Sequence, residues 1–137
     1  AGDPAVMAAV IKSYPGVQYR YDPRASLTGM AEWLKAGELL ITHGWFTGSG
    51  HVIVLDGLRE DADGSWHFNV KDPWSEFDGP SWSYNKPGVN FFDGYYSERV
   101  IYAACVAGGG KTDAARAYRS DKVDRATKAA WVHRISR

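Results

Sequence analysis

The order of the secondary-structure patterns along the chain predicts an α+β fold, in which helices pack on a mostly antiparallel β-sheet. Two helical patterns come first, over 4–14 and 27–36, and extended patterns follow them. The extended runs 52–58 and 66–71 are joined by the turn sequence Glu-Asp-Ala-Asp-Gly, as in an antiparallel hairpin. Helices followed by hairpin-linked strands indicate an α+β domain rather than a parallel sheet with alternating helices.

Each of the two helices has a recognisable start and end. Asp3, which is followed by proline, is typical of an N-cap, and Pro15 ends the apolar stripe after it. Ser26 is the expected cap of the second helix, and Gly37 ends that helix. Both helices carry apolar residues at helical spacing, so we expect one face of each to pack on the sheet.

Extended segments account for most of the remaining first hundred residues. Strands are predicted at 17–21, 38–45, 52–58, 66–71 and 100–106. The last of these runs is apolar throughout, as in a central strand. The segment 74–97 is rich in Trp, Tyr, Phe, Gly and Pro but has no periodicity, and an irregular segment of this length in a compact domain is usually functional.

The pattern divides the chain into a domain over 1–106 and a Gly-rich linker with a basic helical tail over 107–137. Three glycines at 108–110 interrupt the chain, and 112–135 has the pattern of a polar helix with a thin apolar stripe. The first part carries a net charge of −5 and the tail +5, so the whole chain is neutral. A mildly acidic domain argues against a nucleic-acid-binding core.

Composition excludes several other classes of protein. With 45% hydrophobic and 14% aromatic residues, the chain is predicted to be globular. No apolar run reaches the roughly 20 residues of a membrane span and no signal peptide opens the chain, so we expect a soluble protein with no membrane partner. A single cysteine excludes an internal disulfide. No pattern in the sequence calls for a cofactor.

His51 and Asp72 are the strongest candidate pair for catalysis. His51 precedes the first strand of the hairpin after Gly-Ser-Gly, and Asp72 follows the second strand. If the hairpin closes symmetrically between Asp61 and Ala62, the pair lies directly opposed, with Cβ atoms about 5 Å apart. A carboxylate at that distance can orient an imidazole and stabilise its charged form. A one-residue slip of the hairpin would move the two side chains to opposite faces.

The residues offer no evident nucleophile for a triad. Cys105 is the only thiol, and it lies in the apolar run 100–106, where we expect it to be buried and inert. Ser49 lies in the glycine loop before His51 and is expected to shape that loop.

Other kinds of site are less well supported. Residue type alone would allow a zinc site from His43, His51, His67 and Asp72, but His67 is predicted on the other hairpin face and no His-x-x-x-His spacing occurs. The run Gly-Gly-Gly-Lys-Thr at 108–112 resembles a phosphate-binding loop without its first glycine, and a linker ending in a cap at residue 112 is the better interpretation. The basic residues of the tail have the pattern of a solvated helix face.

Three segments in this order resemble the papain-like cysteine peptidases that process bacteriocin leaders, the double-glycine peptidases. They are a helix ending in Leu-Lys-Ala-Gly and leading into a strand at 28–44, Gly-His-Val-Ile-Val-Leu-Asp-Gly at 50–57, and Asn-Val-Lys-Asp-Pro-Trp at 69–74. The resemblance extends over about residues 4–105 and is strongest to stand-alone relatives in phage lysins and bacterial cell-wall enzymes.

This resemblance implies a papain-like fold, with His51 as the catalytic histidine and Asp72 as the acid that orients it. The family's cysteine begins a helix well upstream, after a glutamine of the oxyanion hole, and this chain has no such segment. We therefore expect the nucleophile on an upstream segment. The alternative is a non-catalytic papain-like module, such as a virion, toxin or adaptor component.

The resemblance further implies a thiol hydrolase of peptide bonds. Its lysin-like features favour peptidoglycan peptides as substrate and an enzyme that is secreted, virion-associated or active on the cell wall. Trp45, Trp74 and Trp82 are expected to line the substrate groove, although ordinary packing would explain these aromatic residues equally well.

Overall fold

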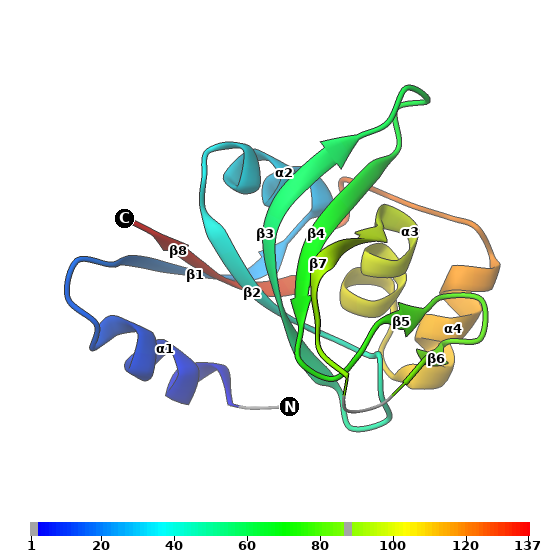
Figure 1. Cartoon of the computed structure of the whole chain (residues 1–137), viewed down its shortest axis with the longest axis horizontal. Coiled ribbons are helices and arrows are strands. Elements are labelled where there is room, and N and C mark those ends of the chain that lie inside the picture. Colours follow the sequence, from blue (N-terminus) through cyan, green and yellow to red (C-terminus); the bar gives the residue numbers. More distant parts are fainter. Residues whose placement is uncertain (1–2, 87–88) are drawn as a thin grey trace.

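A six-stranded antiparallel sheet forms the centre of the molecule in the computed structural model, which describes residues 3–86 and 89–137 (Figure 1). The order is β1-β8-β2-β3-β4-β7, so the first and last strands of the chain are neighbours. The strands are β1 Gln18–Ala25, β8 Ala130–Ser136, β2 Leu39–Gly44, β3 His51–Glu60, β4 Trp66–Asp72 and β7 Phe91–Ser97. A second, two-stranded sheet pairs β5 Phe77–Asp78 with β6 Ser83–Tyr84.

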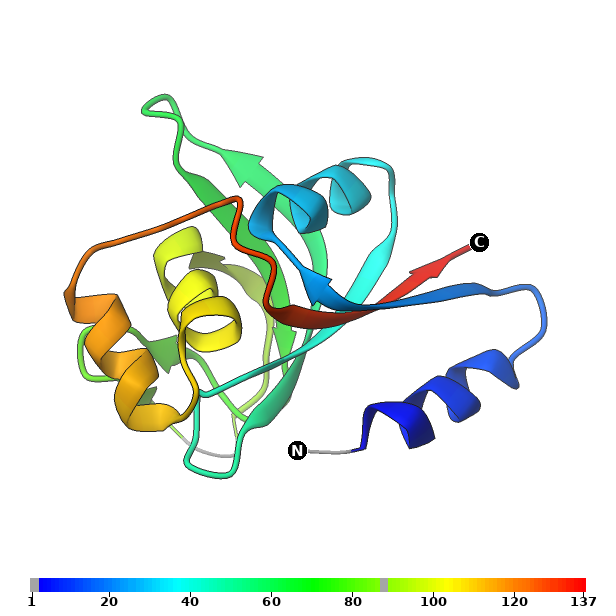
Figure 2. The same ribbon diagram turned by 180° about the vertical axis from the view of Figure 1, so that it is seen from behind.

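Helices lie on both sides of the large sheet. They are α1 Pro4–Lys12, α2 Leu27–Lys35, α3 Glu98–Ile101, its π-helical continuation η1 Tyr102–Ala107, and α4 Lys111–Arg119. In Figures 1 and 2, α1 lies to one side of the sheet and α3 and α4 to the other. None of the helices in the part of the chain that the structure describes is long and apolar enough to cross a membrane.

One hydrophobic core lies between the sheet and the helices α2, α3 and η1. Its large, fully buried side chains come from both layers: Leu27, Met30, Leu40, Phe46, Ile53, Leu55, Phe68, Val70, Ile101 and Val132. Burying an aliphatic or aromatic side chain of this size contributes about 1.5–3 kcal/mol, so these contacts hold the layers together. By contrast, α1 has no buried residue, and Val6 and Val10 on it are exposed.

The fold class and the positions of the first two helices are confirmed, but only the second helix buries residues of its apolar face. The Asp3 carboxylate accepts a hydrogen bond from the Ala5 backbone N–H at 2.9 Å, and the Ser26 hydroxyl accepts one from Gly29 N–H at 3.0 Å. These bonds satisfy amide groups that a helix start leaves unpaired. Gly37, with φ of +89°, ends the second helical segment as expected.

The prediction of a strand over 100–106 is wrong. These residues form the end of α3 and η1, and all seven of them are buried. The Ser97 hydroxyl caps the helix by accepting a hydrogen bond from Val100 N–H at 3.3 Å. A short apolar run is compatible with a buried strand or a buried helix, because neither shows a polar face. The prediction of burial holds, but the type of element does not.

The C-terminal segment is not a helical tail. The helix predicted over 112–135 is shortened to α4, which begins at Lys111 and ends at Arg119, and its cap is Gly110 rather than residue 112. Residues 130–136 form β8, which pairs with β1 and with β2. The division of the chain after residue 106 is thus corrected, because β8 completes the central sheet. Over only seven residues, the two-residue period of apolar side chains in a strand can be mistaken for the thin apolar stripe of a helix.

Candidate active site

The β3–β4 hairpin differs from the symmetric hairpin predicted from the sequence. Leu55 pairs with Val70 and not with Phe68, which instead pairs with Leu58. The register shifts between these two pairs, so β3 contains one extra residue at Asp56. This is the arrangement of a β-bulge, in which two residues of one strand oppose one residue of its partner.

The bulge decides which face of the sheet Asp72 occupies. Continued from the turn without a bulge, the register would place Asp72 opposite Val54, on the face away from His51. The shifted register pairs Lys71 with Val54, and its continuation by one residue places Asp72 opposite Ile53 instead. Because strand side chains alternate between faces, Ile53 and His51 lie on one face, and Asp72 joins them there. His51 and Asp72 are therefore diagonal neighbours on adjacent strands, offset by two residues from the directly opposed pair that was predicted.

His51 and Asp72 are in direct contact. His51 Nε2 lies 2.9 Å from Asp72 Oδ1, the His51 side chain is 18% exposed, and the Asp72 side chain is fully buried. If Nε2 carries the proton that it donates to Asp72, the other ring nitrogen, Nδ1, is the basic one. The geometry thus provides an oriented imidazole next to a buried carboxylate, as general-base chemistry requires.

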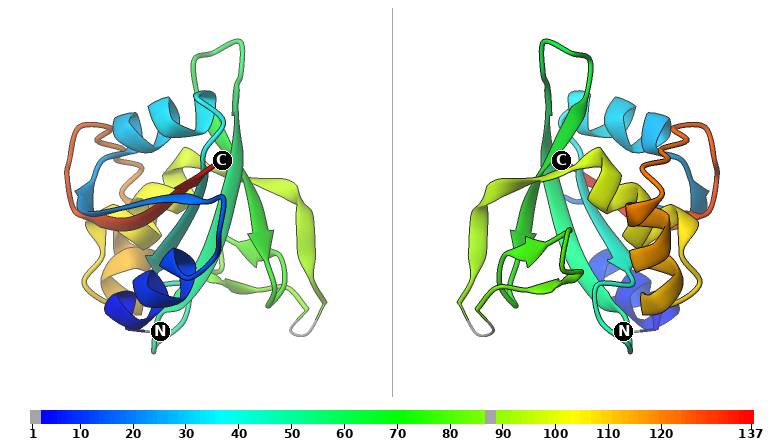
Figure 3. Two further views of the ribbon diagram at one scale, coloured as in Figure 1. Left: turned by 90° about the vertical axis from the view of Figure 1, so that its left-hand side faces the viewer. Right: turned by 90° about the vertical axis from the view of Figure 1, so that its right-hand side faces the viewer.

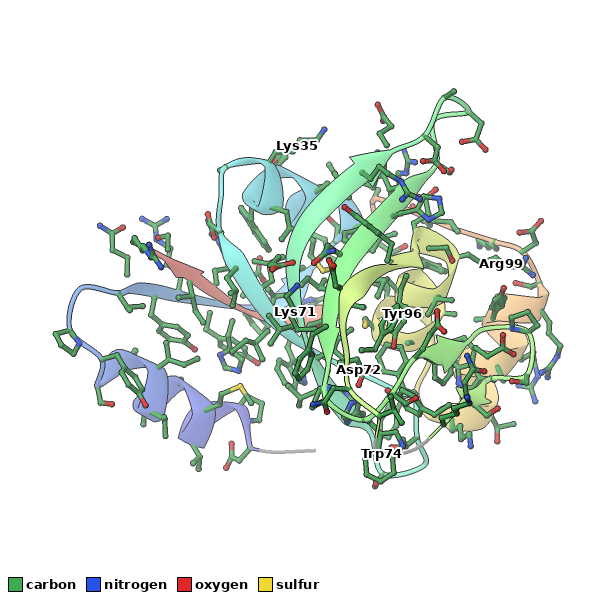
Figure 4. The ribbon with its side chains drawn as sticks, in the orientation of Figure 1. Lys35, Lys71, Asp72, Trp74, Tyr96 and Arg99 are labelled. Carbon is green, nitrogen blue, oxygen red and sulfur yellow. The ribbon has the colours of Figure 1, made fainter. Side chains whose placement is uncertain are left out.

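The Asp72 carboxylate has hydrogen-bond donors on both oxygens. Oδ1 also accepts from Trp74 N–H at 3.1 Å, and Oδ2 accepts from the hydroxyls of Tyr84 and Tyr96, both at 2.8 Å. Figure 4 shows Tyr96 near Asp72, with Trp74 beyond the end of β4. A buried charge without such donors would cost several kcal/mol. These contacts explain how a carboxylate is kept in the interior.

Sequence reasoning missed Tyr84 and Tyr96. Burial, followed by the Asp72 charge, raises the pKa of both phenols, so both hydroxyls stay protonated and can donate. Both residues lie in the aperiodic segment 74–97, whose aromatic content was the only signal. That signal does not identify which tyrosines fold back on Asp72.

Two glycines shape the chain around His51. Gly50 has φ of +81°, and a Cβ there would lie 2.0 Å from His43 Nε2. A Cβ at Gly44 would lie 2.4 Å from the Phe46 ring, which packs edge-on against His51 with centroids 6.4 Å apart. The glycines therefore permit a tight entry into β3 and a close aromatic wall.

The three tryptophans predicted for a substrate groove lie in different environments. Trp74 is 49% exposed and packs against Tyr84, with ring centroids 6.4 Å apart. Trp45 is half-buried and meets His43 edge-on. Trp82 is only 3% exposed and donates its indole N–H to the Trp45 carbonyl at 3.0 Å. The expectation that Trp82 lines an open groove is therefore corrected, because its ring belongs to the core.

The remaining candidates do not complete a triad or a metal site. Cys105 is buried in η1, and burial raises the pKa of its thiol to about 12. Ser49 is exposed in the β2–β3 loop. His67 is paired with Asp61 at the other end of the hairpin, 2.9 Å away. Within residues 3–86 and 89–137, no three His, Cys, Asp or Glu side chains are close enough to bind a metal ion.

The antiparallel sheet with its His–Asp pair has the features of a papain-like α+β peptidase domain. A family model described as the papain-like cysteine protease AvrRpt2 matches residues 16–85, and this range includes His51, Asp72 and Tyr84. The matched range is half of the chain, so the chain belongs to this family of papain-like cysteine proteases. No curated protein and no solved structure matches the chain.

Proposed function

We propose that this chain supplies the general base and its orienting carboxylate to a thiol peptidase. The observation that supports this role is the 2.9 Å contact between His51 Nε2 and the fully buried Asp72 carboxylate. Asp72 holds the tautomer in which Nδ1 is free, so Nδ1 can take the proton of a cysteine thiol.

In the proposed reaction, the resulting thiolate attacks the carbonyl carbon of a peptide bond. Asp72 stabilises the imidazolium that forms on His51. When the C–N bond breaks, Nδ1–H returns its proton to the leaving amine, and an acyl-thioester remains on the cysteine. Water then attacks the thioester, with Nδ1 accepting its proton, and the thiol is regenerated.

The proposed nucleophile is a cysteine on a segment that precedes this chain. Cys105 is a poor candidate, because its thiol is buried and its pKa is raised to about 12. The start of α1 lies at the end of the sheet where the β2–β3 loop leads into His51 (Figures 1 and 3). A segment leading into α1 would thus approach the neighbourhood of the histidine.

For the substrate, two sources of peptide are proposed. The family description, a protease, favours polypeptide chains. The resemblance of the segments around His51 to double-glycine peptidases and lysins favours the peptides of bacterial peptidoglycan. Trp74, which is exposed beside the site, and Trp45 are the proposed apolar contacts for either substrate.

The test uses the chain extended by the residues that precede it in its natural protein. Hydrolysis of a fluorescently labelled unfolded polypeptide and of purified cell walls is measured for the wild type and for His51→Ala. We expect the substitution to lower the rate at least about a thousandfold, as for removal of a triad base. His67→Ala is the matched control, because His67 lies at the other end of the hairpin. Undiminished hydrolysis by His51→Ala would remove the histidine from the mechanism.

A non-catalytic papain-like module is the second candidate, and the burial of the only cysteine favours it. In that case the extended protein would hydrolyse neither substrate. Iodoacetamide would also alkylate no thiol of the segment before residue 1 faster in the wild type than in His51→Ala. A thiol whose alkylation slows in His51→Ala supports the peptidase instead.

A further inference from the structure

We infer that Tyr84 is a positioning residue for the His51–Asp72 pair, an inference that rests on the proposed function. Its hydroxyl, together with that of Tyr96, holds the Asp72 carboxylate in the orientation in which Oδ1 meets His51 Nε2. Tyr84 comes from the small β5–β6 sheet and Tyr96 from β7, so two separate elements fix one side chain.

The distribution of donors over the carboxylate supports this role. The two hydroxyls bind Oδ2 at 2.8 Å each, while Trp74 N–H and His51 Nε2 bind Oδ1 at 3.1 and 2.9 Å. An ionised carboxylate has about four acceptor positions, so these donors use all of them. Rotation of the carboxylate would break four hydrogen bonds at once, which leaves one orientation for the oxygen that contacts His51.

Tyr84 also contacts the imidazole itself. Its ring packs edge-on against His51, with centroids 5.8 Å apart and an interplanar angle of 87°. The phenol therefore restrains His51 by packing and Asp72 by hydrogen bonding. Because burial and the Asp72 charge raise its pKa, the hydroxyl remains a donor at any pH at which a peptidase works.

Tyr84 allows a cleaner test than Tyr96. The Tyr96 oxygen also accepts from Phe77 N–H at 3.0 Å and lies 3.1 Å from the Ser75 carbonyl, so its removal disturbs the start of β5. By contrast, the hydrogen bond of the Tyr84 hydroxyl within the described residues is the one to Asp72. Tyr84→Phe therefore removes one bond and retains the ring.

The experiment measures exchange with water of the His51 ring proton on Nε2, by nitrogen-edited proton NMR of the 137-residue chain. We expect Tyr84→Phe to speed this exchange about tenfold, the factor that corresponds to a hydrogen bond to a charged group. Tyr95→Phe is the matched control, because Tyr95 is exposed and its ring lies under Arg59. The backbone spectrum shows whether each variant keeps the fold.

A second variant keeps the test decisive if Tyr84→Phe loosens the domain. In an Asp72→Asn background, Tyr84→Phe should cause no further change in exchange, because the hydroxyl acts through the carboxylate. An exchange rate in Tyr84→Phe equal to that of the wild type, or effects of the two substitutions that simply add, would overturn the inference.

Activity is measured separately on the extended protein. There, Tyr84→Phe should lower kcat about tenfold with little change in KM, whereas Tyr95→Phe should change neither. If the ring-proton exchange responds but no variant or wild type hydrolyses a substrate, the positioning stands and the proposed function fails. If hydrolysis occurs and is unaffected by Tyr84→Phe, the inference fails and the proposed function stands.

Discussion

At the scale of single residues, burial separates the histidine of this chain from its cysteine. His51 keeps part of its ring open beside Asp72, whereas Cys105 is enclosed between η1 and the sheet. A Cβ at Gly44 of β2 would lie only 3.0 Å from the Cys105 sulfur, so the thiol is packed directly against the strand. Burial of the sulfur away from solvent disfavours the thiolate.

We therefore expect Cys105 to be unreactive in the folded chain. At pH 8 a thiol with a pKa of about 12 is ionised to roughly one part in ten thousand, and burial also blocks access of a reagent. A disulfide reagent such as DTNB should release no colour over an hour in buffer, and one equivalent at once in 8 M urea. Stoichiometric reaction of the native chain within minutes would return Cys105 to the list of nucleophile candidates.

The same contrast of residues shows what the sequence could predict of the site. His51 and Asp72 were identified because one hairpin joins them and turn signals and strand patterns are local. Tyr84 and Tyr96 were not, because their approach to Asp72 depends on the path of segment 74–97, which no periodic pattern constrains. Trp82 was misplaced for the same reason: nothing local distinguishes a core indole from one at a surface.

At the scale of elements, the bulge in β3 accommodates one extra residue while His51 and Asp72 stay on the same face of the sheet. Deleting Asp56 should remove the extra residue and leave the pairs on both sides of it unchanged, Leu55 with Val70 and Gly57 with Asn69, so Asp72 should stay on the face of His51. The free energy of unfolding, measured by urea denaturation, should therefore fall by less than the roughly 3 kcal/mol that loss of the buried pair would cost. The His51 ring proton should remain protected from exchange with water.

Asp56→Ala is the control for this deletion. It keeps the residue count of β3 and removes only a partly exposed ion pair to Lys71, at 3.5 Å, which contributes less than about 1 kcal/mol. Loss of the protected ring proton in the deletion variant, with its retention in Asp56→Ala, would show that the strands do not keep these pairs once the extra residue is removed.

The elements themselves were predictable where their signals are local. The caps at Asp3 and Ser26 were assigned correctly, because each depends on a few adjacent residues. The hairpin turn was placed in the right segment, but it is centred on Asp63 rather than between Asp61 and Ala62. The run 100–106 was misassigned because its apolar character is equally compatible with a strand. The bulge was missed although Gly57 directly follows Asp56, because a single glycine inside a strand is also compatible with a regular strand.

At the scale of the whole molecule, β8 closes the sheet by entering between β1 and β2. Gln18, a partner on β1, precedes its β8 partner by more than a hundred residues, and Thr42, a partner on β2, precedes its own by about ninety. The Thr42 hydroxyl also donates a hydrogen bond to the Trp131 carbonyl at 2.8 Å. Arg134 adds an ion pair to Glu38 at 2.8 Å. Such long-range pairing has no local signal, which is why the charge pattern alone suggested a solvated tail.

This arrangement predicts opposite outcomes for two deletions of equal length at the two ends of the chain. Removing residues 127–137 eliminates β8, exposes the buried Val132 contacts and leaves β1 and β2 without a common partner. We expect this variant to show no cooperative thermal transition by circular dichroism. Removing residues 3–13 eliminates α1, which has no buried residue and contacts β1, so the domain should unfold cooperatively within about 5 °C of the wild type. A cooperative transition near that of the wild type after loss of 127–137 would mean that the sheet is stable without its sixth strand.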